Sequence, residues 1–304
     1  MECEIKELIV NSSDNIHSLY GKLYIPKGEI KGLFHIVHGM TEHIERYADF
    51  MAELAENGYV AFGYDNLGHG RTARDDSELG FISHKNGWIH LVNDVSAFEN
   101  AVQKLFPDKP LYLFGHSMGS FIVRIAAENK GENIEKLIIC GTGGKNPLAP
   151  FGLMLSNIIR LFKGEKYISD FLIDMAFGTY NKKFESISKY DWLTKEIEII
   201  EKYKEDKFCT FKFTVSAMRD LISLNHICNK KSWYKQIRKD LPILIISGND
   251  DPVGNYGKGV KQVYNDLLKH NANVKLKLYE NCRHEILNDT CRNEVLSDIL
   301  NFIR

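Results

Sequence analysis

Buried-strand patterns recur along most of this chain. Short, mostly apolar runs, typical of strands covered on both faces, occupy residues 32–37, 60–64, 110–114, 136–140 and 241–246, and a further predicted strand at residues 274–279 alternates apolar residues with lysines. Stretches with apolar side chains at helical spacing separate several of these runs, as in residues 88–105. Residues 4–26 instead alternate around a polar turn, which predicts a hairpin at the edge of a sheet. The pattern as a whole predicts an α/β fold built on a doubly wound, mostly parallel sheet.

The alternation of strands and helices stops between residues 145 and 233. Residues 151–162 are apolar around nearly the whole circumference of a helix, and a second apolar stretch follows at residues 170–177. We therefore expect two parts of one core, residues 1–144 and 234–304, with a helical cap at residues 145–233 between them.

Composition narrows the class of protein. The 304 residues carry a formal net charge of −1 and are 44% hydrophobic, so one large core is expected and nucleic-acid binding is not. The first residues lack the charged and apolar regions of a signal peptide, and no apolar run approaches a membrane span, so the expected location is the cytoplasm.

The cysteines and histidines show no metal-ligand spacing. No C-x-x-C pair occurs among the six cysteines, so we expect reduced, mostly buried thiols, no metal and no cofactor. Cys282 precedes His284 by two residues, and it either packs as a small apolar side chain or lies near a pocket.

The strongest chemical signal is Gly115-His116-Ser117-Met118-Gly119, which lies between an apolar run and a helix-like run. A G-x-S-x-G sequence at a strand-to-helix corner is typical of a nucleophile elbow. The glycines permit a sharp turn that presents the serine hydroxyl at its tip.

A serine nucleophile needs an acid and a base, in the chain order serine, acid, histidine. Asp250 and Asp251 follow the predicted strand at residues 241–246, and His284 follows the strand at residues 274–279. His284 is the candidate base. Asp251 is favoured as the acid because Pro252 fixes the backbone after it. Asp250 is instead interpreted as a turn residue whose side chain accepts hydrogen bonds from nearby backbone amides.

An oxyanion hole requires backbone N–H groups from the residue after the nucleophile and from an earlier loop. Met118 supplies the first group. In the loop after residues 32–37, Gly39 allows a turn that aims the Met40 amide at the site, with His38, Gly39 and Glu42 as its expected support.

Taken together, these motifs resemble those of the monoacylglycerol lipase and lysophospholipase branch of the α/β-hydrolases, in the serine aminopeptidase family. The matching blocks, in chain order, are His38–His43 with Arg46-Tyr47, Asp65–Arg71, Gly115–Gly119, Asn249–Val253 and Arg283–Glu285. The resemblance implies an eight-stranded α/β-hydrolase sheet with a helical cap after strand 6. It also implies a triad of Ser117, Asp251 and His284, with Met40 and Met118 as oxyanion donors.

The predicted function is a serine carboxylester hydrolase that cleaves acyl monoesters, such as monoacylglycerol or lysophospholipid, through an acyl-enzyme. Apolar cap residues either form the cap's own core or line an acyl pocket and touch lipid aggregates; the pocket candidates are Phe151, Leu155, Ile159 and Phe177. A broad short-chain esterase is the main alternative.

Two further alternatives stay open. An aminopeptidase would need cap acids to hold a free amine, and Asp170, Asp174 and Glu165 are available. A non-catalytic binding protein is disfavoured because no triad position is lost. The pattern gives no oligomeric state.

Overall fold

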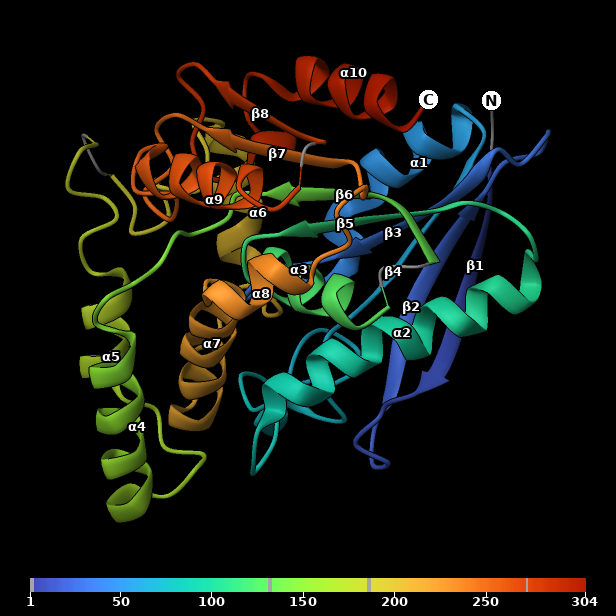
Figure 1. Ribbon diagram of the computed structural model, residues 1–304. Coiled ribbons are helices and arrows are strands. Elements are labelled where there is room, and N and C mark those ends of the chain that lie inside the picture. Colours follow the sequence, from blue (N-terminus) through green and yellow to red (C-terminus); the bar gives the residue numbers. More distant parts are fainter. Residues whose placement is uncertain (1–2, 131–132, 185–186, 272) are drawn as a thin grey trace.

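The protein is described by a computed structural model that covers residues 3–130, 133–184, 187–271 and 273–304. One eight-stranded sheet forms its centre, in the order β1-β2-β4-β3-β5-β6-β7-β8 (Figure 1). The strands are β1 (Glu4–Asn11), β2 (Ser18–Ile25), β3 (Gly32–Val37), β4 (Tyr59–Tyr64), β5 (Leu111–His116), β6 (Ile134–Cys140), β7 (Ile243–Gly248) and β8 (Val274–Tyr279). β1 and β2 form the predicted edge hairpin, and the strands from β4 to β8 in this order are parallel. The predicted fold class is confirmed.

Helices cover both faces of the sheet. The core helices are α1 (Ala48–Glu56), α2 (Gly87–Leu105), α3 (Met118–Lys130), α9 (Lys258–Leu268) and α10 (Arg292–Ile303), with short 3₁₀ helices η1 (Ile44–Tyr47), η2 (Asp76–Glu78) and η4 (Ile286–Asn288). Buried side chains of α1 and α10 share one apolar cluster, whereas those of α2, α3 and α9 share the other. The inner parallel strands β3, β4, β5 and β7 are therefore buried on both sides, which is why their sequences are apolar runs, whereas the edge strand β8 is partly exposed and alternates with lysines.

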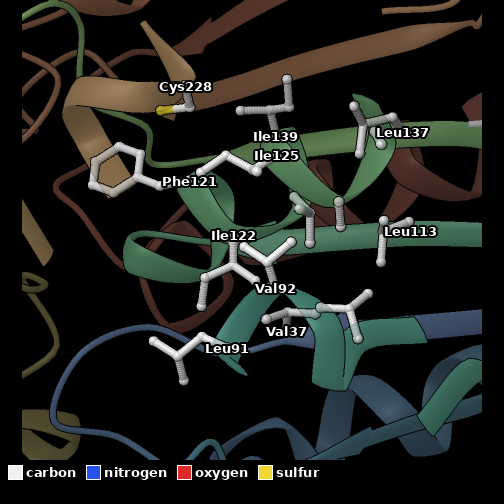
Figure 2. Close-up of a cluster of buried hydrophobic side chains, with 14 of the residues drawn as sticks. Val37, Leu91, Val92, Leu113, Phe121, Ile122, Ile125, Leu137, Ile139 and Cys228 are labelled. Atoms are coloured by element: carbon white, nitrogen blue, oxygen red, sulfur yellow. The ribbon is translucent and has the colours of Figure 1, made fainter. Parts of the chain in front are cut away.

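The larger cluster shows how the nucleophile's helix is fixed. Ile122 and Ile125 on α3 and Leu91 on α2 lie in the same buried cluster as Leu113 of β5 and Ile139 of β6 (Figure 2). Burial of each such side chain contributes roughly 1.5–3 kcal/mol, so the start of α3 is held rigidly at the end of β5.

Helices occupy the long segment between β6 and β7, and we call residues 145–233 the insert. Its helices are α4 (Ala149–Lys163), α5 (Asp170–Phe177), α6 (Ile197–Glu205) and α7 (Val215–Cys228); α8 (Lys231–Gln236) contains the predicted boundary. Trp233 and Tyr234 of α8 belong to the main core cluster, so α8 packs with the core. α4 and α5 lie away from the sheet beside α7 (Figure 1). In the described parts of the chain, no helix combines the length and the apolarity that crossing a bilayer requires.

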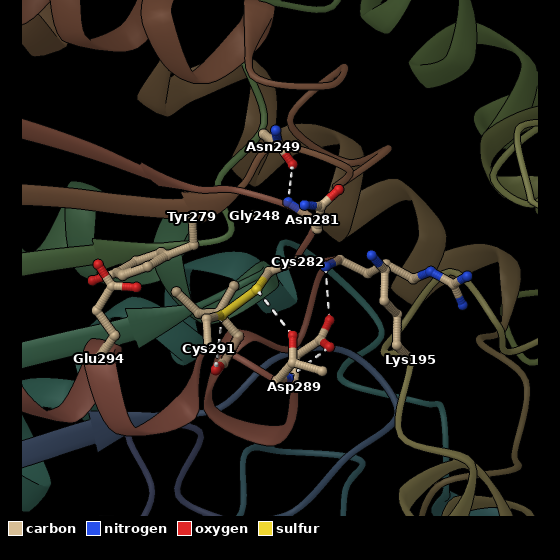
Figure 3. The surroundings of a disulfide bond; sticks show 12 residues. Lys195, Gly248, Asn249, Tyr279, Asn281, Cys282, Asp289, Cys291 and Glu294 are labelled. Carbon is tan, nitrogen blue, oxygen red and sulfur yellow. Dashed lines mark hydrogen bonds between the residues drawn. A yellow bond between two sulfur atoms is a disulfide. The ribbon is translucent and has the colours of Figure 1, made fainter.

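The expectation of reduced cysteines is wrong for one pair. Cys282 and Cys291 are joined by a disulfide, whereas Cys3, Cys140, Cys209 and Cys228 are free (Figure 3). The chain folds back through η4 between the two bonded cysteines, which brings residues nine positions apart into contact. Their spacing in the sequence carried no recognised signal.

Candidate active site

The predicted nucleophile lies at a sharp corner between β5 and α3. Ser117 has a φ of 54°, in the left-handed region that side chains rarely adopt. A Cβ at Gly119 would lie 2.0 Å from the Val37 carbonyl oxygen, and one at Gly115 would lie 2.4 Å from the Gly119 carbonyl oxygen. Only glycines fit on either side of this corner. The strained backbone therefore presents Ser117 to the pocket described below.

The predicted acid and base are paired. His284 Nδ1 lies 2.9 Å from Asp251 Oδ2, which also accepts a hydrogen bond from the Ser247 hydroxyl at 3.1 Å. The Val253 amide donates to the other carboxylate oxygen at 2.8 Å. Asp251 is fully buried, whereas Asp250 is more exposed and lies 3.8 Å from Lys195. The geometry therefore favours Asp251 over Asp250 as the partner of the histidine.

Two rings flank His284. The His116 ring lies 4.7 Å and the Trp192 ring 5.1 Å from it, between centroids. Because Nδ1 faces Asp251, the second ring nitrogen, Nε2, is available to the pocket that His284 and Ser117 both line. This is the arrangement that a general base for Ser117 requires.

Hydrogen bonds of the buried His38 side chain fix the loop after β3. The Asn66 amide donates to His38 Nε2 at 2.8 Å, so the His38 proton is on Nδ1, which donates to the Gly39 carbonyl at 2.8 Å. Burial lowers the pKa of His38, which favours this neutral form. A Cβ at Gly39 would lie 2.8 Å from Ser117 Cβ, so glycine allows the loop to approach the nucleophile. Met40 and Met118 line the same pocket as Ser117.

A buried charged cluster lies behind the loop. Glu42 accepts hydrogen bonds from the Gly39 amide and from Tyr47 (3.1 Å), and its carboxylate lies 3.0 Å from His116 Nδ1. Arg46 donates two hydrogen bonds of 2.7 Å to Glu285, the residue after His284.

These charges stabilise one another. Burial opposes ionisation of Glu42, but His116 and Arg46 outweigh it and hold the Glu42 pKa below its usual range. Burial also opposes charge on His116, yet Glu42 raises the His116 pKa overall. The cluster thus fixes the loop that carries Met40 to the elbow and to the His284 segment.

The insert contacts the same loop. The Tyr203 hydroxyl on α6 donates to the Thr41 carbonyl at 2.8 Å, and His43 Nε2 lies 2.8 Å from Asp206 Oδ2. One ligand atom from each of His43, Asp206 and Cys209 lies within 4.8 Å of the others, a grouping that sequence spacing did not signal. Burial raises the pKa of the Cys209 thiol and thereby favours its protonated form, which is a poor metal ligand.

A cavity of about 520 Å³ opens above Ser117. It is lined largely by apolar side chains of the insert and α3, namely Phe121, Ile173, Met175, Phe177, Leu193, Phe211, Phe213, Met218, Leu221 and Ile222. This volume lies within the range of small-molecule sites.

The predicted pocket residues divide into two groups. Phe177 lines the cavity, but Phe151, Leu155 and Ile159 do not, and Phe151 is half exposed. Of the four predicted residues, the cavity therefore supports Phe177 alone. The reason is the rotation of α4, whose small residues Gly152 and Ser156 are buried. A Cβ at Gly152 would lie 3.2 Å from Ile222 of α7, so α4 packs through that face.

Sequence patterns missed an aromatic wall. The rings of Phe177, Tyr180, Trp192 and His284 are in successive contact, with centroid separations of 5.5, 5.1 and 5.1 Å. Tyr180 and Trp192 lie outside the insert's helices, so no periodicity marked them. Their aromatic character was the one available signal.

Comparisons with known proteins agree with this architecture. A family model described as "Serine aminopeptidase, S33" matches residues 28–291. Rat monoglyceride lipase is 31% identical over 121 residues, which are 40% of this chain and 38% of that enzyme. The match thus spans well under half of the rat enzyme's length. The yeast (Saccharomyces cerevisiae) monoglyceride lipase is 26% identical over 274 residues, covering 85% of this chain and 79% of that enzyme.

A solved structure matches almost the whole chain. A thermostable carboxyl esterase from Bacillus coagulans, in complex with glycerol, superposes with a TM-score of 0.92 at 31% sequence identity. The superposition covers 98% of this chain and 97% of the esterase. Together with the match of the family model over most of the chain, it shows that the protein belongs to the serine aminopeptidase S33 family of α/β-hydrolases.

Proposed function

We propose that the protein is a serine carboxylester hydrolase that cleaves acyl monoesters through an acyl-enzyme intermediate. The observation that carries the proposal is the meeting of Ser117, in its strained elbow, with the Asp251-bound His284 in one apolar pocket. The serine, the acid and the base are the groups that acyl transfer requires.

Each residue has a definite task in this mechanism. Ser117 Oγ attacks the ester carbonyl while His284 Nε2 takes its proton, and the Met40 and Met118 amides stabilise the oxyanion. His284 then gives the proton to the leaving alcohol, and the Ser117 ester remains. A water molecule, deprotonated by His284, hydrolyses that ester and restores the serine. Asp251 orients the imidazole and stabilises its charged form.

A monoacylglycerol or lysophospholipid is the favoured substrate class. Its acyl chain would occupy the apolar part of the cavity, and its polar head would face the polar side chains around Glu42 and Tyr203, which also line it. Each buried methylene contributes about 0.8 kcal/mol to binding, so the apolar lining favours substrates with longer acyl chains. The rat and yeast relatives are named monoglyceride lipases, which points to the first of these two substrates.

A short-chain carboxylesterase is the second candidate. It is favoured by the likeness over almost the full chain to the Bacillus coagulans carboxyl esterase. An aminopeptidase has less support, because only one of the three candidate acids, Asp174, lines the cavity. Asp170 pairs with Lys212, and Glu165 pairs with His84 and Arg160.

The outer surface of the insert supports transient contact with lipid aggregates. Leu161 and Phe162 at the end of α4 are 81% and 79% exposed, and Phe171 on α5 is 64% exposed. Lys163 and Lys166 are close to them in the chain. Large apolar side chains this exposed would mark an interaction site if they form one patch. A cytoplasmic location remains a prediction.

Hydrolysis rates across acyl lengths and head groups test the substrate class. We expect kcat/KM to rise with acyl length for monoesters of glycerol and for lysophospholipids. Rates that peak at acetate or butyrate would select the short-chain esterase instead. Cleavage of amino-terminal residues from peptides, without ester hydrolysis, would select the aminopeptidase.

A further inference from the structure

The disulfide closes the loop that carries the candidate base. We call residues 282–291 the base loop: it begins shortly after β8, contains His284 and Glu285, and ends at the start of α10. Cys282 and Cys291 stand at its two ends, with their Cα atoms 6.5 Å apart (Figure 3). The covalent bond therefore ties both ends of the segment on which His284 is mounted.

The base loop also contacts the turn after β7 that carries Asp250 and Asp251. The Asp250 amide donates to the Cys282 carbonyl at 3.0 Å, and a Cβ at Gly248 would lie only 2.0 Å from the same oxygen. If Cys282 moves, Asp250 moves with it through this hydrogen bond. His284 moves too, because only Arg283 separates it from Cys282 in the chain. Cys282 is thus one hydrogen bond from the neighbour of Asp251 and two residues from His284.

Residues inside the base loop are held by hydrogen bonds to the insert. The Glu285 amide donates to the Leu193 carbonyl at 2.7 Å, and the Thr194 hydroxyl donates to the Asn288 carbonyl at 2.7 Å. Within the loop, the Arg283 amide donates to Asp289 at 2.8 Å. The disulfide fixes the loop ends without help from the insert.

We propose that the Cys282–Cys291 pair is a reversible modification site, at which a dithiol reductant opens the base loop and lowers turnover. The proposal rests on the proposed function, since His284 must act as the base. The oxidised form is the fully active one, because its closed loop keeps His284 Nδ1 within hydrogen-bond distance of Asp251.

The exchange takes place in two balanced steps. Cys291 is partly exposed and Cys282 is buried, so a thiolate of the reductant attacks the Cys291 sulfur. The protein's S–S bond breaks, and Cys282 leaves as a thiolate that takes up a proton. The reductant's second thiolate then attacks its own bound sulfur and releases Cys291, which is protonated in turn. Two electrons pass to the protein, and the reductant departs as a cyclic disulfide.

The experiment compares the purified full chain before and after treatment with dithiothreitol. Alkylation under denaturing conditions, followed by mass measurement, should add four groups to the oxidised protein and six to the reduced one, given six cysteines with one bonded pair. On a water-soluble ester, reduction should lower kcat by about three- to tenfold and change KM by less than about twofold, because base alignment governs the chemical step. Oxidised dithiothreitol should restore kcat.

Active-site titration separates a switch from simple loss of fold. A fluorophosphonate should label the same fraction of oxidised and reduced protein, so that kcat per labelled site falls. Cys291→Ser should resemble the reduced enzyme and ignore the reductant, whereas the matched control Cys3→Ser should respond like the wild type.

Three results would overturn the proposal. These are six alkylated thiols in protein treated with oxidised dithiothreitol, an unchanged kcat in fully reduced protein, or a loss of activity that follows the labelled fraction. A failure of the proposed function itself would look different, because the oxidised protein would then hydrolyse no ester.

Discussion

Truncation of Phe177 tests which residues form the acyl pocket. Phe177 lines the cavity and reaches His284 only through the rings of Tyr180 and Trp192, so a short acyl group on Ser117 is not expected to touch it. Phe177→Ala removes a ring that contacts about two to three methylenes of a long chain. At about 0.8 kcal/mol per methylene, the loss is about 2 kcal/mol, or about 30-fold in kcat/KM.

The assay compares p-nitrophenyl laurate with p-nitrophenyl butyrate. The laurate value should fall about 30-fold and the butyrate value by less than about threefold. Phe151→Ala is the matched control, because Phe151 is also an insert phenylalanine but lies outside the cavity. Its chain-length ratio should stay at the wild-type value. Equal losses on both esters in Phe177→Ala, with a lowered Tm, would refute the reasoning.

Further predictions concern the predicted triad acid Asp251, the buried carboxyl group of Asp220 and the hydrogen bond between Tyr203 and Thr41. Asp251→Asn should reduce kcat by about 10⁴ and Asp250→Asn by less than about tenfold; the reverse order in steady-state kinetics would move the acid to Asp250. Burial raises the pKa of Asp220 to about 7 and outweighs the nearby Gly87 and Trp88 amides, which act to lower it; neither carboxylate oxygen has a well-formed hydrogen bond. The folded state therefore binds the extra proton between about pH 4 and pH 7, and its stability falls as pH rises through that window. Urea unfolding of Asp220→Asn should show a smaller fall between pH 5 and pH 8, and an unchanged slope would contradict the shift. Tyr203→Phe removes the hydrogen bond to the Thr41 carbonyl, so on p-nitrophenyl butyrate, which has no glycerol or phosphate head group, kcat should fall about three- to tenfold with KM nearly constant. A pure rise in KM would assign Tyr203 to substrate binding instead.

The fold and the Ser117, Asp251 and His284 constellation could be predicted because local patterns specify them. A buried parallel strand is apolar throughout, and the residue that follows it lies at one edge of the sheet, so three strand ends place three side chains together. The tight corner at Ser117 demands glycines, which are visible in any sequence. Each of these signals is contained in a few consecutive residues.

The pocket and the disulfide could not be predicted in this way. α4 is apolar nearly all round, so its pattern gives no preferred face, and the choice is made by Gly152 packing on α7. Trp192 reaches His284 from an irregular segment, and Tyr203 reaches Thr41 across 162 positions. Cys282 and Cys291 meet because η4 turns the chain back. These contacts depend on tertiary packing that no short window contains.

Covalent labelling with a fluorophosphonate, followed by peptide mass spectrometry, identifies the nucleophile directly. We expect one adduct per chain on Ser117, complete loss of labelling and ester hydrolysis in Ser117→Ala, and an unchanged Tm in that variant. An adduct on another residue, or ester hydrolysis that survives in folded Ser117→Ala, would contradict this assignment of the nucleophile.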